Sequence, residues 1–402
     1  MLMYNVHAEN QVYRGGRTEG VCAAAVGLLI IVSMQPVYLL SKFALAAAYA
    51  ILAVIIIGSA FLSNGLRRYW GVRYLAFYIS VVLFFLCMYF PFRKLDTFNF
   101  YSVVVALALF CMALKASYIK ASCLYVEKYF FVITLLGLFS YILFVFKIPF
   151  PEVFKVHGES NNLTYTSYFF SFKVSGQQLD LLGVGLYRNS SIFPEPGHYG
   201  LYLALFLLLF WAELGVYKRI IYLLALVTTF SAASYMAFPF ILILAFFKVR
   251  TLRARDCLKG AAVFAVAVIA IYLLRDVISA RVISKFGGGS ISNVLSERAV
   301  TDLSLGYILS NSPVLGLGRD ALEVLGITSS DYKVYILRFG FIGVVSFVFM
   351  LCMFQMLLVK DKIAAAVISL FVVAIFLHRS WMIDKVYIYY LMACFFVWRS
   401  EA

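Results

Sequence analysis

Charged residues are scarce in this chain. They make up 13% of its 402 residues, while hydrophobic residues make up 64%. A soluble globule of this size needs more polar surface than that to face water. The scarcity of charge therefore excludes a soluble globular protein and predicts an all-α, polytopic membrane protein.

Cysteine and histidine are also few, with seven and four copies. No cysteine falls in the two long polar segments described below, and the sequence contains neither a DxD nor an HExxH motif. This pattern excludes a disulfide framework and predicts no metal site and no cofactor. The glycine run at 286–290 lacks the Lys-Ser/Thr of a P-loop, so we expect a hinge there and no nucleotide site.

Long apolar runs fill most of the chain, and we predict about twelve transmembrane helices from them. Several are shorter than the roughly 20 residues that a perpendicular helix needs. The pair within 219–247 is separated only by a Ser-Ala-Ala-Ser break and could be two short helices that meet near mid-membrane. The runs are 21–40, 43–62, 72–90, 100–114, 129–147, 197–213, 219–231, 234–247, 260–274, 336–359, 363–377 and 386–398.

The connections between the runs predict the orientation. With the N-terminus inside, the inner connections carry eighteen Lys and Arg residues and the short outer ones carry five. Because the short cytoplasmic loops of membrane proteins carry an excess of Lys and Arg, we expect both termini to be cytoplasmic. We interpret 1–402 as a single integral membrane domain with two long external loops, 148–196 and 275–335.

The first long loop contains NNLTYTSYFFS, a composition able to hydrogen-bond sugar hydroxyls and to stack on their rings, although an ordinary solvated loop has it too. At its end, Pro194 and Pro196 fix the backbone around Glu195, so a helix can start only at about Gly197. The positive pole of that helix favours an ionised carboxylate. A simple helix cap is the alternative interpretation of Glu195.

Several arginines lie in the two long loops, the segments large enough to form a site. Guanidinium groups bind pyrophosphate with two parallel hydrogen bonds, and interfacial anchoring is the alternative role. These arginines are Arg188, Arg281, Arg298 and Arg319, with Arg275 and Arg338 at the loop margins.

These features together resemble the bacterial O-antigen polymerase family, which belongs to a superfamily with the O-antigen ligases. The resemblance lies in the order and spacing of loose motifs in the second half of the chain. They are RNSSIFPEPGHYG, then TTFSAASYMAF, then SERAVTDLSLGYILSNSPVLGLG, and finally RFGFIGVVSFV as the start of the next span.

The resemblance implies a GT-C-type glycosyltransferase of the bacterial inner membrane, with both long loops in the periplasm. Its substrates would be a donor and an acceptor glycan, each carried on undecaprenyl pyrophosphate, and a flippase and a chain-length regulator would act beside it. We expect Glu195 or His198 to be the base and Arg298 to neutralise the leaving pyrophosphate without a metal. Arg188, Arg281 and Arg319 would bind pyrophosphate or glycan.

Two other functions are considered. An O-antigen ligase, which transfers glycan to lipid A core, is expected to use a histidine in the second long loop, and 275–335 contains none. A polysaccharide flippase or other transporter usually places charges within its spans, whereas here most charge lies in the connections. Both considerations favour the polymerase.

Overall fold

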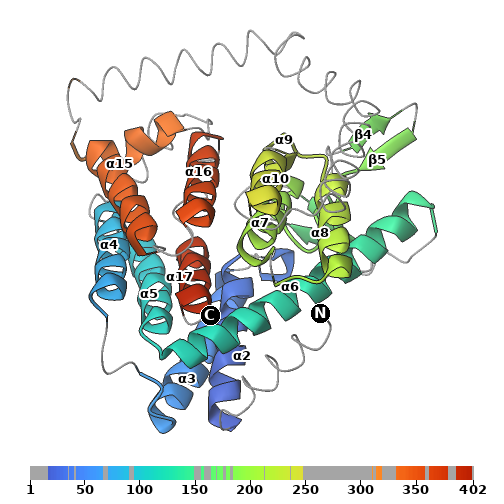
Figure 1. Ribbon diagram of the computed structural model, residues 1–402. Coiled ribbons are helices and arrows are strands. Elements are labelled where there is room, and N and C mark those ends of the chain that lie inside the picture. Colours follow the sequence, from blue (N-terminus) through green and yellow to red (C-terminus); the bar gives the residue numbers. More distant parts are fainter. Residues whose placement is uncertain are drawn as a thin grey trace.

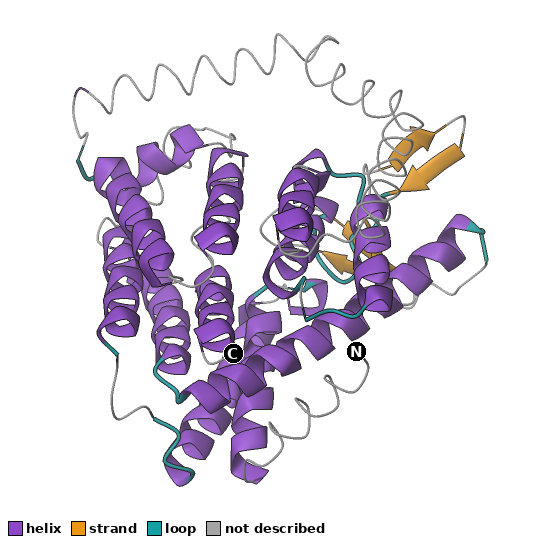
Figure 2. Cartoon of the chain, in the orientation of Figure 1, coloured by secondary structure: helices purple, strands orange, loops and turns teal. Residues whose placement is uncertain are grey.

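The computed structural model shows a mostly helical chain (Figures 1 and 2). The residues that it describes are 17–34, 36–39, 42–66, 71–89, 95–148, 155–157, 164–168, 170–174, 178–181, 184–211, 213–235, 237–247, 310, 314–318, 332–357, 362–378 and 386–400. The predicted span 260–274 and most of the second long loop lie outside these residues.

Helices occupy each of the other predicted apolar runs, because a helix satisfies the backbone groups of an apolar segment within the segment itself. They are α2 (Arg17–Ser33), α3 (Lys42–Leu62), α4 (Val72–Tyr89), α5 (Leu95–Met112), α6 (Ala116–Val145), α7 (Pro196–Phe210), α8 (Val216–Thr228), α9 (Ala232–Tyr235), α10 (Ala237–Phe247), α15 (Tyr332–Leu357), α16 (Lys362–His378) and α17 (Val386–Ser400), with a short 3-10 turn η1 (Val37–Leu39).

Three helices in the described part of the chain are long and apolar enough to cross a membrane, within 43–62, 116–145 and 332–356. Shorter apolar helices lie at 72–87, 196–210 and 362–377. Large apolar side chains on the outer helices face outward, among them Phe43, Val54, Val72 and Val345. Such a surface suits contact with lipid, so the fold is compatible with an all-α membrane protein.

Helix α6 begins well before the predicted start of its span at residue 129. The interval 116–128 was interpreted as a connection because it carries Lys120 and Lys128, but it continues as helix. No proline or glycine interrupts 116–136, so the chain has no local reason to leave the helix. In Figure 1, α6 runs obliquely across the molecule, past both of its groups of helices.

The first long loop contains five short strands that the sequence analysis did not predict. β1 (Lys155–His157), β2 (Thr164–Tyr168) and β3 (Ser171–Val174) form one antiparallel sheet, and β4 (Gln178–Leu181) pairs with β5 (Val184–Tyr187). Figure 2 shows these strands near one end of α6. The segment NNLTYTSYFFS, which was considered for sugar binding, therefore includes β2 and the first residue of β3.

Helix α7 lies at the centre of the group α7–α10 (Figure 1). Of its fifteen residues, only His198 is not buried. A helix that is apolar on all sides is stable where other helices or lipid surround it, and here it is buried within the protein. The first turn is therefore the one part of α7 that has a partly exposed side chain.

The helical run within 219–247 is interrupted, but earlier than the Ser231–Ser234 break that the sequence suggests. α8 ends at Thr228, residues 229–231 are not helical, and Ala232–Tyr235 form the short helix α9. Phe230 between them has a positive φ of 45°, an unusual conformation for a bulky residue.

The chain turns tightly at 314–318, a segment that contains Gly316 and Gly318. Both glycines have positive φ values, 68° and 88°. The turn lies against a break in α15 at Gly340, where φ is 60°, and a Cβ atom on Gly316 would come within 2.6 Å of the Gly340 nitrogen. Only glycine permits this approach of two backbones.

Candidate active site

Residues 188–195 connect β5 to α7 and form the base of the candidate site. We call this connection together with the 228–234 turn the corner. Asn189 donates from its backbone nitrogen to the Thr228 carbonyl (3.0 Å) and from its side-chain amide to Thr228 Oγ1 (2.9 Å). Arg188 Nε donates to the Thr229 carbonyl (3.1 Å). Two segments about forty residues apart in sequence are thus joined by three hydrogen bonds.

The serines of the connection attach it to the rest of the fold. Ser190 Oγ donates to the Phe172 carbonyl (3.1 Å) in β3, and Ser191 Oγ donates to the Ile133 carbonyl (3.3 Å) in α6. Gly137 of α6 allows the second contact, since a Cβ atom there would lie 2.2 Å from Ser191 Oγ. Ser191 also has a positive φ of 49°. Such strained residues occur often at functional sites.

Glu195 occupies the N-cap position of α7, with an extended backbone (φ −136°, ψ 141°), and Pro196 is the first helical residue. The predicted helix start is therefore confirmed to within one residue. The Glu195 carboxylate makes no capping hydrogen bond. Instead, its Oε2 lies 3.4 Å from His198 Nε2, one helical turn further on.

At the open end of α7 the Glu195 side chain is 33% exposed, whereas that of His198 is 14% exposed and its Nε2 atom, which faces Glu195, is buried. When the imidazole is protonated, the two groups form an ion pair. A carboxylate beside an imidazole can orient the ring and stabilise its charge after it accepts a proton, as a general base requires. The two residues predicted as alternative bases are therefore neighbours.

Thr229 contacts both Arg188 and α7. Its carbonyl accepts from Arg188, while its hydroxyl lies 3.2 Å from where a Cβ atom would be on Gly200 of α7. A Cβ on Gly200 would also overlap Ser234 Oγ, at 1.6 Å. The first turns of α7 thus pack directly on the break between α8 and α10, and Gly200 is the residue that permits it.

The other predicted site residues, Arg281, Arg298 and Arg319, lie outside the described residues. Among the residues that the structure does describe, no three His, Cys, Asp or Glu side chains lie close enough together to hold a metal ion.

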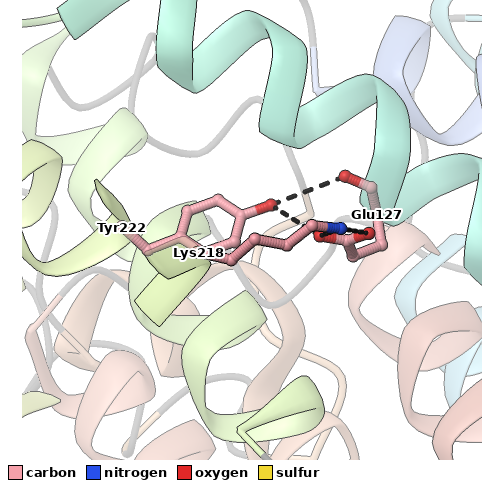
Figure 3. Close-up of polar contacts among 3 residues, drawn as sticks. All are labelled: Glu127, Lys218 and Tyr222. Carbon is pink, nitrogen blue, oxygen red and sulfur yellow. Dashed lines mark hydrogen bonds and ion pairs between the residues drawn. The ribbon is translucent and has the colours of Figure 1, made fainter. Parts of the chain in front are cut away.

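The sequence analysis missed a second polar cluster, which joins α6 to α8 (Figure 3). Lys218 Nζ donates to both carboxylate oxygens of Glu127, at 2.8 and 3.0 Å, and the Tyr222 hydroxyl lies 3.4 Å from Glu127 Oε1. We call these three residues the clamp. Lys218 and Tyr222 lie one turn apart on α8, but Glu127 is distant in sequence and no local pattern marks it as their partner.

Comparisons with protein-family models, with curated proteins and with solved structures found no match for this chain. The function is therefore argued from the corner itself and from the motifs that form it.

Proposed function

We propose that this protein is a membrane glycosyltransferase that polymerises oligosaccharide repeat units carried on undecaprenyl pyrophosphate. One observation supports this most: the corner joins two stretches that resemble O-antigen polymerase motifs, RNSSIFPEPGHYG and TTFSAASYMAF. They are separate in sequence, and their junction lies beside the one open end of α7.

The proposed chemistry uses side chains of the corner together with His198 and the arginines of the second long loop. The Glu195–His198 pair accepts the proton of an acceptor sugar hydroxyl, whose oxygen attacks the anomeric carbon of the donor sugar. The new glycosidic C–O bond forms as the bond from that carbon to the lipid pyrophosphate breaks. Arg188, together with Arg281, Arg298 and Arg319, meets the developing negative charge. The pyrophosphate linkage already activates the donor, so no nucleotide is needed.

The topology of the proposal is the one that the sequence predicts. About twelve helices span the inner membrane, both termini are cytoplasmic, and the loops 148–196 and 275–335 share the periplasmic side. The lipid carrier can then reach the site from the bilayer, while the glycan extends into the periplasm. A flippase and a chain-length regulator are the expected partners.

The direct test uses purified protein in nanodiscs with a lipid-linked repeat unit as the sole substrate. We expect a ladder of polymer on a gel, because donor and acceptor are the same compound. We also expect the ladder to persist in EDTA, since arginines replace a metal in this mechanism. Loss of the ladder in EDTA and its return with Mg²⁺ or Mn²⁺ would contradict the arginine mechanism. Absence of any ladder would contradict the polymerase.

One observation favours a transporter as the second candidate. Glu127 and Lys218 of the clamp are charged, and Glu127 lies on α6, one of the helices able to cross a membrane. Ionisable residues within spans often mark transport pathways. A transporter would move the lipid-linked glycan across proteoliposomes without lengthening it, so the same preparation distinguishes the two functions.

A further inference from the structure

Strand β3 is bound to the first residues of the corner along its outer edge. It is the last strand in the sheet order β1-β2-β3. On the side away from β2, the Phe172 nitrogen donates to the Ser191 carbonyl (3.0 Å), and the Phe172 carbonyl accepts from Ser190 Oγ (3.1 Å). A change in the position of β3 would therefore move the corner.

The two central residues of β3 belong to different clusters. Successive side chains of a strand point to opposite faces of its sheet. Phe172 packs with Val37 and Tyr165 in a small buried core. Lys173, the next residue, is half-buried and contacts the rings described below. The core fixes one face of β3, and Lys173 is placed to fix the other.

Lys173 lies among three aromatic rings. Its ammonium nitrogen is 4.6 Å from the ring centroids of Phe144 and Tyr168 and 5.9 Å from that of Tyr187. Phe144 makes edge contacts with both tyrosines, at centroid distances of 5.3 and 5.1 Å. The Tyr168 hydroxyl donates to the Ile148 carbonyl, just beyond α6. Cation–π attraction therefore holds β3, the end of α6 and the end of β5 together.

Tyr187 connects this cluster to the candidate site, because it directly precedes Arg188 in the chain. The hydrogen bond from Arg188 Nε to the Thr229 carbonyl (3.1 Å) requires the backbone at 187–188 to keep one direction. The contacts of the Tyr187 ring with Lys173 and Phe144 restrict that direction. Lys173 can thus act on Arg188 through Tyr187 and through β3.

We propose that Lys173 is a positioning residue for Arg188. It fixes the direction from which the guanidinium group meets the leaving pyrophosphate and does not itself bind the substrate. The inference rests on the proposed function, in which Arg188 has that role. Because the contact is that of a cation on ring faces, arginine can replace lysine here, whereas alanine cannot.

Hydrogen exchange of the full-length protein in nanodiscs measures the effect on the corner without any substrate. Lys173→Ala should speed the exchange of the backbone amides at 189–193 about fivefold, as the loss of one cation–π contact provides. Lys173→Arg should restore slow exchange. The amides at 222–226 of α8 report the fold and should not change. Lys147→Ala, an exposed lysine just beyond α6, is the matched control and should change nothing.

Turnover of a lipid-linked repeat unit tests whether the effect reaches the chemistry. Lys173→Ala should lower kcat about fivefold and leave KM unchanged, because Arg188 acts on charge that develops in the transition state. In the Arg188→Lys protein, Lys173→Ala should cause no further loss, since a positioning residue acts only through the group that it positions. A residue that only stabilised the sheet would lower the melting temperature and leave the kcat of the folded protein unchanged.

Three results would overturn the positioning role: unchanged exchange at 189–193 in Lys173→Ala, a loss of turnover that Lys173→Arg does not restore, or a full additional loss in the Arg188→Lys protein. If the unaltered protein makes no ladder, the proposed function fails. The exchange measurement still decides whether Lys173 fixes the corner, so the two proposals fail separately.

Discussion

The corner and the clamp are both polar clusters in an apolar protein, yet they use their charges in opposite ways. In the clamp, Lys218 binds both carboxylate oxygens of Glu127, whose side chain is only 10% exposed. In the corner, backbone groups and the side chains of serine, threonine, asparagine and Arg188 join the segments, and Glu195 remains one-third exposed.

The difference indicates which cluster is available for chemistry. An ion pair whose carboxylate is buried satisfies that charge internally, and losing the cation is then costly. In the corner, neutral hydrogen bonds and one bond from Arg188 fix the backbone, and the Glu195 side chain can still meet a ligand. We therefore interpret the clamp as scaffold and the corner as site, and the predictions below test that assignment.

The largest effect is expected from replacing Arg188 with lysine, and the reverse change at Lys218 is its control. Arg188→Lys keeps the positive charge but loses the Nε hydrogen bond to Thr229 and the guanidinium geometry. Turnover should fall roughly 10²–10³-fold, as when one preorganised donor is removed. The reciprocal exchange, Lys218→Arg, keeps the ion pair and should leave the rate within about threefold. Polymer yield per milligram of membrane-extracted protein checks both, and equal losses would refute the assignment.

Packing at the corner gives the next largest effect. Gly200→Ala forces a methyl group into Ser234, so the folded protein should be destabilised by about 1–3 kcal/mol. Adding Ser234→Gly removes the atoms that the methyl meets and should restore much of the loss. Gly58→Ala in α3 is the control, because nothing lies within 4 Å of its added Cβ. Thermal unfolding in detergent reports all three, and an unaffected Gly200→Ala protein would show that this contact is not tight.

The sequence predicts the helices well and their connections poorly. An apolar run predicts a helix because its backbone groups can bond only to one another there. The segment 116–128 is charged and was therefore interpreted as a connection, but it is helical, and Lys218 of α8 pairs with its Glu127. The strands of 155–187 are only three to five residues long, so the alternation in each is too short to identify it, and their pairing depends on contacts that the chain makes elsewhere.

For the candidate site, the local part was predictable and the long-range part was not. Two prolines around Glu195 predict the start of α7. The contact of Arg188 with Thr229 was not predictable, because a backbone carbonyl accepts the bond and any residue type supplies one.

A smaller effect should come from the clamp. Lys218→Met leaves the Glu127 carboxylate without its cation, and since Lys218 is 36% exposed, water partly compensates. We expect a loss of about 0.5–1.5 kcal/mol in stability. The charge swap Glu127→Lys with Lys218→Glu should recover part of it. Lys115→Met, an exposed lysine next to the start of α6, serves as the control. Unfolding that is unchanged in Lys218→Met would show that the clamp is not structural.

One measurement tests the assignment most directly: polymer length and melting temperature of Glu195→Gln and Glu127→Gln, purified side by side. Both changes remove one carboxylate charge and keep its shape. We predict that Glu195→Gln makes no polymer and melts like the unaltered protein, whereas Glu127→Gln melts at a lower temperature and still makes polymer when assayed below that temperature. A normal ladder from Glu195→Gln, with no ladder from a fully folded Glu127→Gln protein, would contradict the account.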